Sequence, residues 1–185
     1  AGLAGLAAFG LSVLGVSLLE FQARRIGSTS EVTDHLGLPL VGTLPPMISR
    51  HRRRVAAPPG EEATSPLAES IDAARSALLH AADVQGVRAV MITSALGGEG
   101  KTSLACHLAV SLARAGRKTL LLDADLRCPT AHLLLDLLPE PGLSELLRGE
   151  AELEDVIQSA GLPGLEMIAS GRSDARAIQA LAWPE

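Results

Sequence analysis

A glycine-rich loop at residues 94–103 constrains the fold of this chain more than any other feature. Its sequence is Ser-Ala-Leu-Gly-Gly-Glu-Gly-Lys-Thr-Ser. An apolar run over residues 87–93 precedes the loop, and a helical pattern over residues 102–115 follows it. This order predicts a strand, a tight loop and a helix, which is the layout of a phosphate-binding loop (P-loop).

Glycine at three positions of the P-loop lets the backbone turn tightly and direct its N–H groups at phosphate oxygens. The positive end of the following helix strengthens this attraction. In such loops the lysine reaches the β- and γ-phosphates and the next hydroxyl binds Mg²⁺, which assigns these roles to Lys101 and Thr102. Ala95 stands where the usual motif begins with glycine. The candidate nucleotide-binding residues are Gly97, Gly98, Glu99, Gly100, Lys101, Thr102 and Ser103.

A second candidate site lies one strand–helix–strand unit further along the chain. Residues 118–123 read Lys-Thr-Leu-Leu-Leu-Asp and predict a short buried strand, parallel to the strand before the P-loop. Asp123 and Asp125 lie at its carboxyl end, with Arg127 two residues later. Because ligands of open α/β sheets bind beyond the carboxyl ends of the strands, we expect both carboxylates to face the bound phosphates and metal. Taken alone, the two residues would also fit carboxylates that cap the following turn.

Residues 120–127, Leu-Leu-Leu-Asp-Ala-Asp-Leu-Arg, resemble the second Walker motif of the bacterial tyrosine kinases that act in capsule and exopolysaccharide synthesis. The P-loop also resembles theirs, although Gly97 stands where the family usually has proline. Further stretches look like the family, so that the resemblance covers nearly the whole chain: residues 36–45, 125–132, 142–149 and 165–171. The nearest alternative is the partitioning and cell-division ATPases, whose P-loop carries a lysine where this chain has Leu96.

This resemblance implies an α/β fold, a P-loop NTPase domain with a mainly parallel, incomplete sheet over residues 67–185. It also implies an ATP-dependent tyrosine (auto)kinase that regulates exopolysaccharide polymerisation and export, with ATP and Mg²⁺ as cofactors. Asp125 would be the candidate base, and Arg127 would hold phosphate or a neighbouring subunit. The catalytic residues would be Lys101, Asp123 and Asp125, and the metal ligands Thr102 and Asp123. The alternatives are a membrane scaffold that binds ATP without phosphoryl transfer, and a partitioning-type ATPase.

The front of the chain has the composition of a membrane segment. Residues 1–19 carry no charge and would span roughly 28 Å as a helix, close to the ~30 Å hydrocarbon core of a bilayer. Basic residues occur only after this run, which by the positive-inside rule predicts that the rest of the chain is cytoplasmic. We therefore expect an inner-membrane protein with a transmembrane helix over residues 1–22 and a juxtamembrane linker over residues 23–66. A buried helix of a soluble domain is the alternative.

Several features concern partners. A basic run at residues 50–54 could contact anionic lipid or remain solvated. A helix is predicted over residues 67–82, and its Glu69, Asp72 and Arg75 share one face. They look like the family's oligomerisation motif, which has arginine in place of Asp72, so the resemblance implies a homo-oligomer but leaves a contact through this helix open. It also implies protein tyrosines as substrates and the polysaccharide polymerisation and export machinery as a partner. A net charge of −5 and an aromatic content of 2% argue against nucleic acid.

Two features of the kinase family are missing from the sequence. P-loop NTPases supply a further Asp at the end of another apolar strand, and no Asp follows the apolar run over residues 165–169. The run that ends in Asp136 lies too close to Arg127 for a crossover, and Thr130 is placed to cap a helix there. The resemblance implies that the missing strand follows Glu185. It also implies a tyrosine cluster there, and this chain itself contains no tyrosine. We therefore expect residues 67–185 alone to have little catalytic activity.

Overall fold

The computed structural model describes residues 5, 9–10, 12–17, 28–35, 37–46, 65–172 and 174–182. The chain forms two units, residues 1–40 and 41–185, which are described separately. In the first unit, the described positions from 5 to 17 are helical, and a π-helical turn, η1 (Glu31–His35), follows. Among the described residues no helix combines the length and apolar character that a membrane span requires. The other positions of the predicted segment 1–22, and residues 47–64 of the predicted linker, lie outside the described residues.

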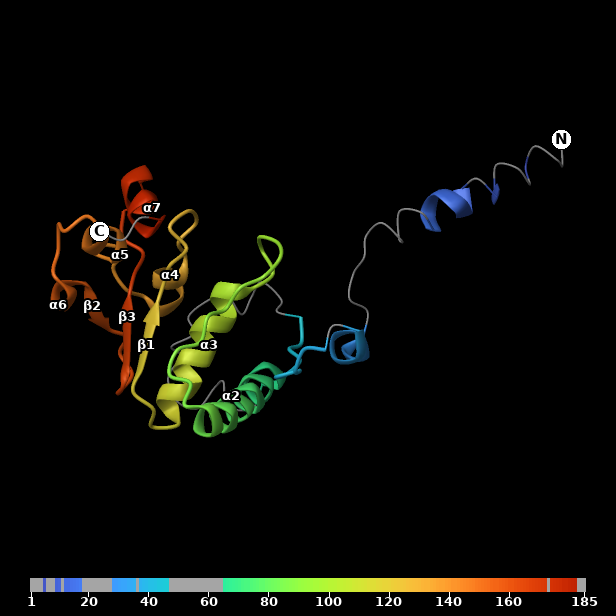
Figure 1. The fold of residues 1–185 in the computed structure, drawn as a ribbon, viewed down its shortest axis with the longest axis horizontal. Helices are drawn as coiled ribbons and strands as arrows, with labels where there is room; N and C mark the ends of the chain where they lie inside the picture. Colours follow the sequence, from blue (N-terminus) through green and yellow to red (C-terminus); the bar gives the residue numbers. More distant parts are fainter. Residues whose placement is uncertain are drawn as a thin grey trace. The chain divides into compact units, whose positions relative to one another are not determined.

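The second unit has an α/β architecture around a small sheet. Its elements in chain order are α2 (Pro66–Gln85), α3 (Lys101–Arg114), β1 (Thr119–Leu122), α4 (Ala131–Leu135), α5 (Leu143–Leu147), α6 (Leu153–Val156), β2 (Ile157–Ser159), β3 (Leu165–Ile168) and α7 (Ala175–Ala182). The strand order is β1–β3–β2, with β1 parallel and β2 antiparallel to β3. The sheet is therefore mixed, whereas the sequence predicted a mainly parallel one. α3 lies between α2 and the sheet (Figure 1).

The core lies on both faces of the central strand, β3. On one face Leu165 and Met167, which are 1% and 0% exposed, pack with residues of α3 and α4. On the other face Ile168 packs with Leu143 of α5 and Ala177 of α7. Successive side chains of a strand point to opposite faces, so this short apolar strand connects two separate apolar clusters. Helices thus cover both faces of β3, as in α/β folds.

The predicted helices before and after the P-loop are present: α2 is slightly longer than the predicted 67–82, and α3 has the predicted length but begins and ends one residue earlier. α2 begins where Ser65 Oγ accepts a hydrogen bond from the Ala68 N–H at 3.1 Å, and Pro66 occupies the first turn. It ends at Gly86, whose φ of 69° suits the residue that follows a helix. The predicted strands over 118–123 and 165–169 are confirmed as β1 and β3, but β1 is not buried as predicted, because its side chains alternate between half-buried and exposed.

The strand predicted over residues 87–93 is wrong. These residues form no strand, and none of their backbone groups has a hydrogen-bond partner in the described part of the chain. Val90 and Met91 are 57% and 85% exposed. An apolar run becomes a strand only when a neighbouring strand pairs with it, and β1 pairs with β3 alone among the described strands.

β1 is covered on one face only. Leu121 packs against the cluster of α3, whereas Leu120 and Leu122 are 51% and 49% exposed. The alternation follows from the pleat of the strand, which sends neighbouring side chains to opposite faces. The face of β1 that carries Leu120 and Leu122 therefore remains largely open to solvent.

Candidate functional site

The P-loop leads directly into α3, which begins at Lys101. Gly98 and Gly100 have φ values of 82° and 91°, in the left-handed region where a residue with a Cβ is strained. The structure therefore has the tight turn that the motif predicts, and the turn requires glycine at these two positions. Lys101, Thr102 and Ser103 are half-buried in the first turn of the helix.

The start of α3 presents backbone donors to a ligand. In the region that the structure describes, the N–H groups of residues 98–101 donate no hydrogen bond. The Glu99 side chain makes a hydrogen bond within the P-loop, where its Oε2 accepts from the Leu96 N–H at 3.1 Å. Unpaired N–H groups at the positive end of a helix form a binding site for an anion such as phosphate.

Asp123 lies directly after β1, where the sequence placed it, and is 7% exposed. Its Oδ1 accepts a hydrogen bond from the Asp125 N–H and its Oδ2 one from the Ala131 N–H, each at 3.2 Å. Burial raises the pKa of the Asp123 carboxyl group, and these two hydrogen bonds offset only part of that effect. The carboxylate thus fixes the turn between β1 and α4 at the carboxyl end of the strand.

Asp125 occupies the same turn and is more open to solvent. Its Oδ1 accepts hydrogen bonds from the N–H groups of Arg127 and Cys128 at 3.3 and 3.1 Å. Its Oδ2 has no partner among the described residues, and the Arg127 side chain is exposed. Both Asp residues therefore make the turn-capping contacts that the sequence left as an alternative. One oxygen of Asp125 remains available to accept a proton or hold a water molecule.

α3 and the end of β1 meet at one edge of the sheet. Burial, and next the charge of Asp123, raise the pKa of the Cys106 thiol to about 12, so the second turn of α3 lies beside Asp123. The thiol is fully buried in the cluster between α3 and the sheet. Within the described residues no hydrogen bond joins the P-loop to Asp123, Asp125 or Arg127. The two predicted halves of the site thus share an edge and are joined by no hydrogen bond within the described residues.

Sequence reasoning missed a charged cluster beside the carboxyl end of β3. Arg148, in the turn after α5, donates hydrogen bonds to Glu145 at 2.7 Å and to Asp174 at 3.2 Å. Glu145 also accepts a hydrogen bond from the Arg172 N–H at 3.1 Å. The cluster ties α5 to the loop between β3 and α7. Its only sequence signal was the stretch 142–149, which resembled the kinase family without indicating a partner.

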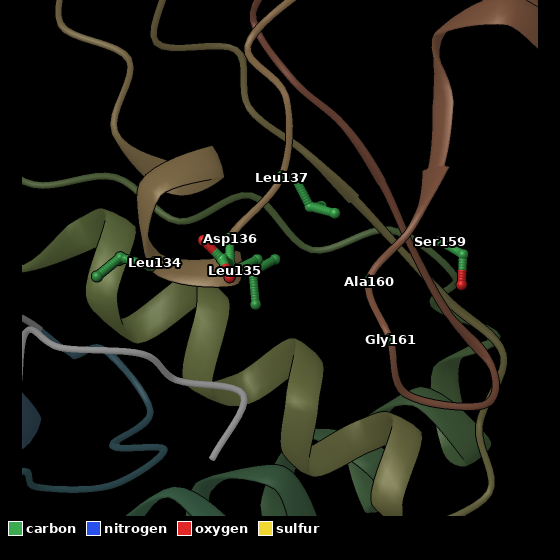
Figure 2. Close-up of a pocket in the computed structure, with 7 residues that line it drawn as sticks. All are labelled: Leu134, Leu135, Asp136, Leu137, Ser159, Ala160 and Gly161. Atoms are coloured by element: carbon green, nitrogen blue, oxygen red, sulfur yellow. The ribbon is translucent and has the colours of Figure 1, made fainter. Parts of the chain in front are cut away.

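A surface pocket of about 340 Å³ lies at the opposite end of the sheet. Figure 2 shows the end of α4 on one side of it and the turn after β2 on the other. The lining residues are Leu134, Leu135, Asp136, Leu137, Ser159, Ala160 and Gly161. The Ala160 N–H bonds to the Leu165 carbonyl group at the amino end of β3, whereas Asp123 lies at the carboxyl end of the parallel strand β1. The pocket is therefore separate from the phosphate site.

Charged residues on one face of α2 make contacts with another helix of the same chain. Asp72 and Arg75 form a salt bridge, and both contact Ser111 of α3, whereas Glu69 is exposed.

The described residues contain no group of three His, Cys, Asp or Glu side chains that could hold a metal ion by themselves. A metal at the P-loop would therefore depend on phosphate oxygens and water as well as on Thr102 and Asp123.

Comparisons with known proteins agree with this geometry. Residues 90–174 match the CobQ/CobB/MinD/ParA nucleotide binding domain family. The chain is 30% identical over 171 residues to the putative tyrosine-protein kinase EpsB of Ralstonia nicotianae (strain ATCC BAA-1114 / GMI1000), covering 86% of this chain and 23% of EpsB. Most of the length of such relatives therefore has no counterpart in this chain.

Two solved kinase domains have the same fold. The BceF tyrosine kinase domain superposes with a TM-score of 0.75 at 27% identity, covering 86% of this chain and 68% of that one. The kinase domain of the Escherichia coli tyrosine kinase ETK gives a TM-score of 0.73 at 29% identity, covering 85% and 65%. The P-loop at the start of α3, the aspartates after β1 and these similarities together show that the chain belongs to the bacterial tyrosine kinases, within the CobQ/CobB/MinD/ParA class of nucleotide-binding domains.

Proposed function

We propose that this chain supplies the nucleotide-binding part of an ATP-dependent protein-tyrosine kinase that regulates exopolysaccharide or capsule polymerisation and export. The observation that carries the proposal is the set of unpaired N–H groups at the start of α3, beside the carboxylate turn after β1. These groups suit the phosphates of a nucleotide, and the matched tyrosine kinases make ATP the expected ligand. The substrate is a tyrosine of another polypeptide or of another part of the same protein.

In this proposal each residue of the site has a distinct role. Lys101 neutralises charge on the β- and γ-phosphates, and the glycine N–H groups orient them. Mg²⁺, held by the Thr102 hydroxyl and by Asp123 directly or through water, would supply further positive charge. The tyrosine oxygen bonds to the γ-phosphorus while the bond from that phosphorus to the β–γ bridging oxygen breaks. The proton of the tyrosine hydroxyl passes to the open Oδ2 of Asp125, and ADP leaves.

The proposed setting is the inner membrane, with the kinase domain on the cytoplasmic side. Residues 1–22 would form a transmembrane helix, residues 23–66 the linker, and residues 67–185 the kinase domain. Support comes from the uncharged run over residues 1–19 and from the basic residues that follow it. We also propose that the protein forms homo-oligomers, contacts membrane lipid through its basic linker, and acts on the polysaccharide polymerisation and export machinery.

The test is Lys101→Met in the full-length protein, with Lys118→Met as the matched control. Lys118 is the other lysine of the chain, and it is exposed and lies outside the P-loop. ATP-dependent phosphotyrosine, measured by immunoblot and mass spectrometry, should disappear in Lys101→Met and persist in Lys118→Met. Undiminished labelling of Lys101→Met would refute the role of the P-loop in catalysis.

A second candidate function is a membrane scaffold that binds ATP without phosphoryl transfer. The observation that favours it is the engagement of both Asp residues in capping the turn after β1. Asp125→Asn separates the two functions, because an amide keeps one oxygen for the turn but cannot accept a proton from tyrosine. Loss of phosphotyrosine with unchanged ATP binding would exclude the scaffold. ATP-dependent assembly in the absence of any phosphotyrosine would support it.

A further inference from the structure

A polar cluster joins α2 to the P-loop helix α3. Arg75 Nη1 contacts Asp72 Oδ1 at 2.6 Å and donates to Ser111 Oγ at 2.7 Å and to the Ser111 carbonyl oxygen at 3.3 Å. The Ser111 hydroxyl donates in turn to Asp72 Oδ1. Ser111 is 5% exposed and the Arg75 side chain 21% exposed, whereas the Asp72 side chain is 54% exposed, so the cluster is buried on the Ser111 side and open to solvent at Asp72. We call these three residues the α2–α3 latch.

The α2–α3 latch joins two parts of the chain that lie before and after the P-loop. Arg75 and Ser111 are 36 residues apart, and the P-loop lies between them. The stretch 87–93, which enters the P-loop directly after α2, makes no backbone hydrogen bond within the described region. Because no strand pairing holds this stretch, the entry side of the P-loop is anchored through α2 and its contacts with α3.

α2 also makes an exposed ion pair of 3.8 Å, between its Asp83 and Arg117 in the turn after α3. Its buried apolar residues Leu67, Ile71 and Ala74 lie outside both apolar clusters of the sheet. On α3, Ser111 shares a face with the buried Leu108, three residues earlier, whereas the cluster residues of this helix face the sheet. α3 is therefore held from two sides, by the sheet and by α2. Ser111 lies ten residues after Lys101, roughly 15 Å along a rigid helix, so a shift at the latch moves the phosphate-binding end as well.

We propose that Asp72, Arg75 and Ser111 are positioning residues for the P-loop, and that they make α2 a nucleotide-responsive part of the kinase domain. The inference rests on the proposed nucleotide-binding function. The latch holds α2 and α3 in the arrangement that presents the unpaired N–H groups to phosphate. By thermodynamic reciprocity, a latch that strengthens nucleotide binding is itself stabilised when nucleotide binds.

The first measurement is the affinity of the full-length protein for a fluorescent ATP analogue with Mg²⁺. Arg75→Ala should weaken binding about 5- to 10-fold, at the lower end of known couplings between sites. Arg176→Ala on α7, an exposed arginine outside the latch, should leave the affinity unchanged. Asp72→Arg should weaken binding, and adding Arg75→Asp should restore it to within about 2-fold, since the exchanged pair keeps opposite charges at the same spacing.

The second measurement is amide hydrogen exchange of α2 with and without the nucleotide analogue. Nucleotide should slow exchange in α2 of the wild type but not of Arg75→Ala, a difference that a loss of overall stability would not produce. Equal affinity of Arg75→Ala and wild type, or no rescue by the exchanged pair, would overturn the proposal while the kinase function stands. If the wild type does not bind the analogue, the proposed function fails first. A double-mutant cycle of Arg75→Ala and Ser111→Ala in urea would then still report whether the latch exists.

Discussion

Replacement of Gly142 by alanine should destabilise the protein through a clash between two backbone segments. Gly142 precedes α5 and lies against the loop that follows β3. A Cβ at this position would overlap the Ala169 carbonyl oxygen and the Gly171 nitrogen, which are backbone atoms and cannot rotate away. The φ of Gly142 is −151°, which any residue can adopt, so close packing alone excludes a side chain.

The size of the effect follows from the hydrogen bonds beside Gly142. The Leu143 N–H donates to the Ala169 carbonyl group at 2.7 Å, and the Ser144 N–H donates to that of Ser170 at 2.9 Å. If the two segments separate to admit a methyl group, both donors lose their partners in a buried region. An orphaned buried donor costs about 1–3 kcal/mol, so the expected loss in the free energy of unfolding is about 2–6 kcal/mol.

The assay is urea unfolding followed by circular dichroism, with Gly149→Ala as the control. Gly149 has a φ of 68° and no atom near the position of a Cβ, so alanine there adds only left-handed strain of about 1–2 kcal/mol. We expect Gly142→Ala to lower the unfolding midpoint further than Gly149→Ala does. An equal or smaller shift for Gly142→Ala would show that the segments can separate at little cost, and would refute the argument.

Three further predictions concern the core, the charged cluster and the thiols. Met167→Ala, at a residue that is 0% exposed, should lower the free energy of unfolding by about 2–5 kcal/mol in urea, because it leaves a cavity between the sheet and α3; a loss below about 1 kcal/mol would contradict the packing described. Burial would raise the pKa of Glu145, but hydrogen bonds from two backbone N–H groups and from Arg148 lower it below its ordinary 4.5. This lowered pKa contributes stability that is present above pH 4.5 and lost as the pH falls through the folded-state pKa. Glu145→Gln should therefore flatten the acid side of a plot of the free energy of unfolding against pH. An unchanged plot would exclude this role. A thiol reagent at pH 8 should modify only the exposed Cys128 in the folded protein and both cysteines in urea, because Cys106 is buried with a pKa of about 12; rapid modification of Cys106 in the folded state would show that α3 opens.

The local features of the P-loop could be predicted from the sequence because they depend on neighbouring residues. Gly98 and Gly100 adopt positive φ, and α3 starts at Lys101, as the motif requires. The helix α2 follows from its apolar spacing. The position of Asp123 and Asp125 after a short apolar strand was equally clear, since the strand and the residues that follow it are contiguous.

The contacts of these residues were decided by the tertiary structure. The apolar pattern over 87–93 predicted a strand, but a strand depends on a partner elsewhere in the chain, and the described sheet provides none. The spacing of Asp72 and Arg75 placed them on one face of a helix without indicating that this face meets Ser111 on another helix. Glu145 and Arg148 likewise gave no sign of their partners beyond β3. Backbone conformation and helix formation follow from short-range sterics and periodicity, whereas strand pairing and polar clusters join residues that are distant in sequence and therefore depend on how the whole domain packs.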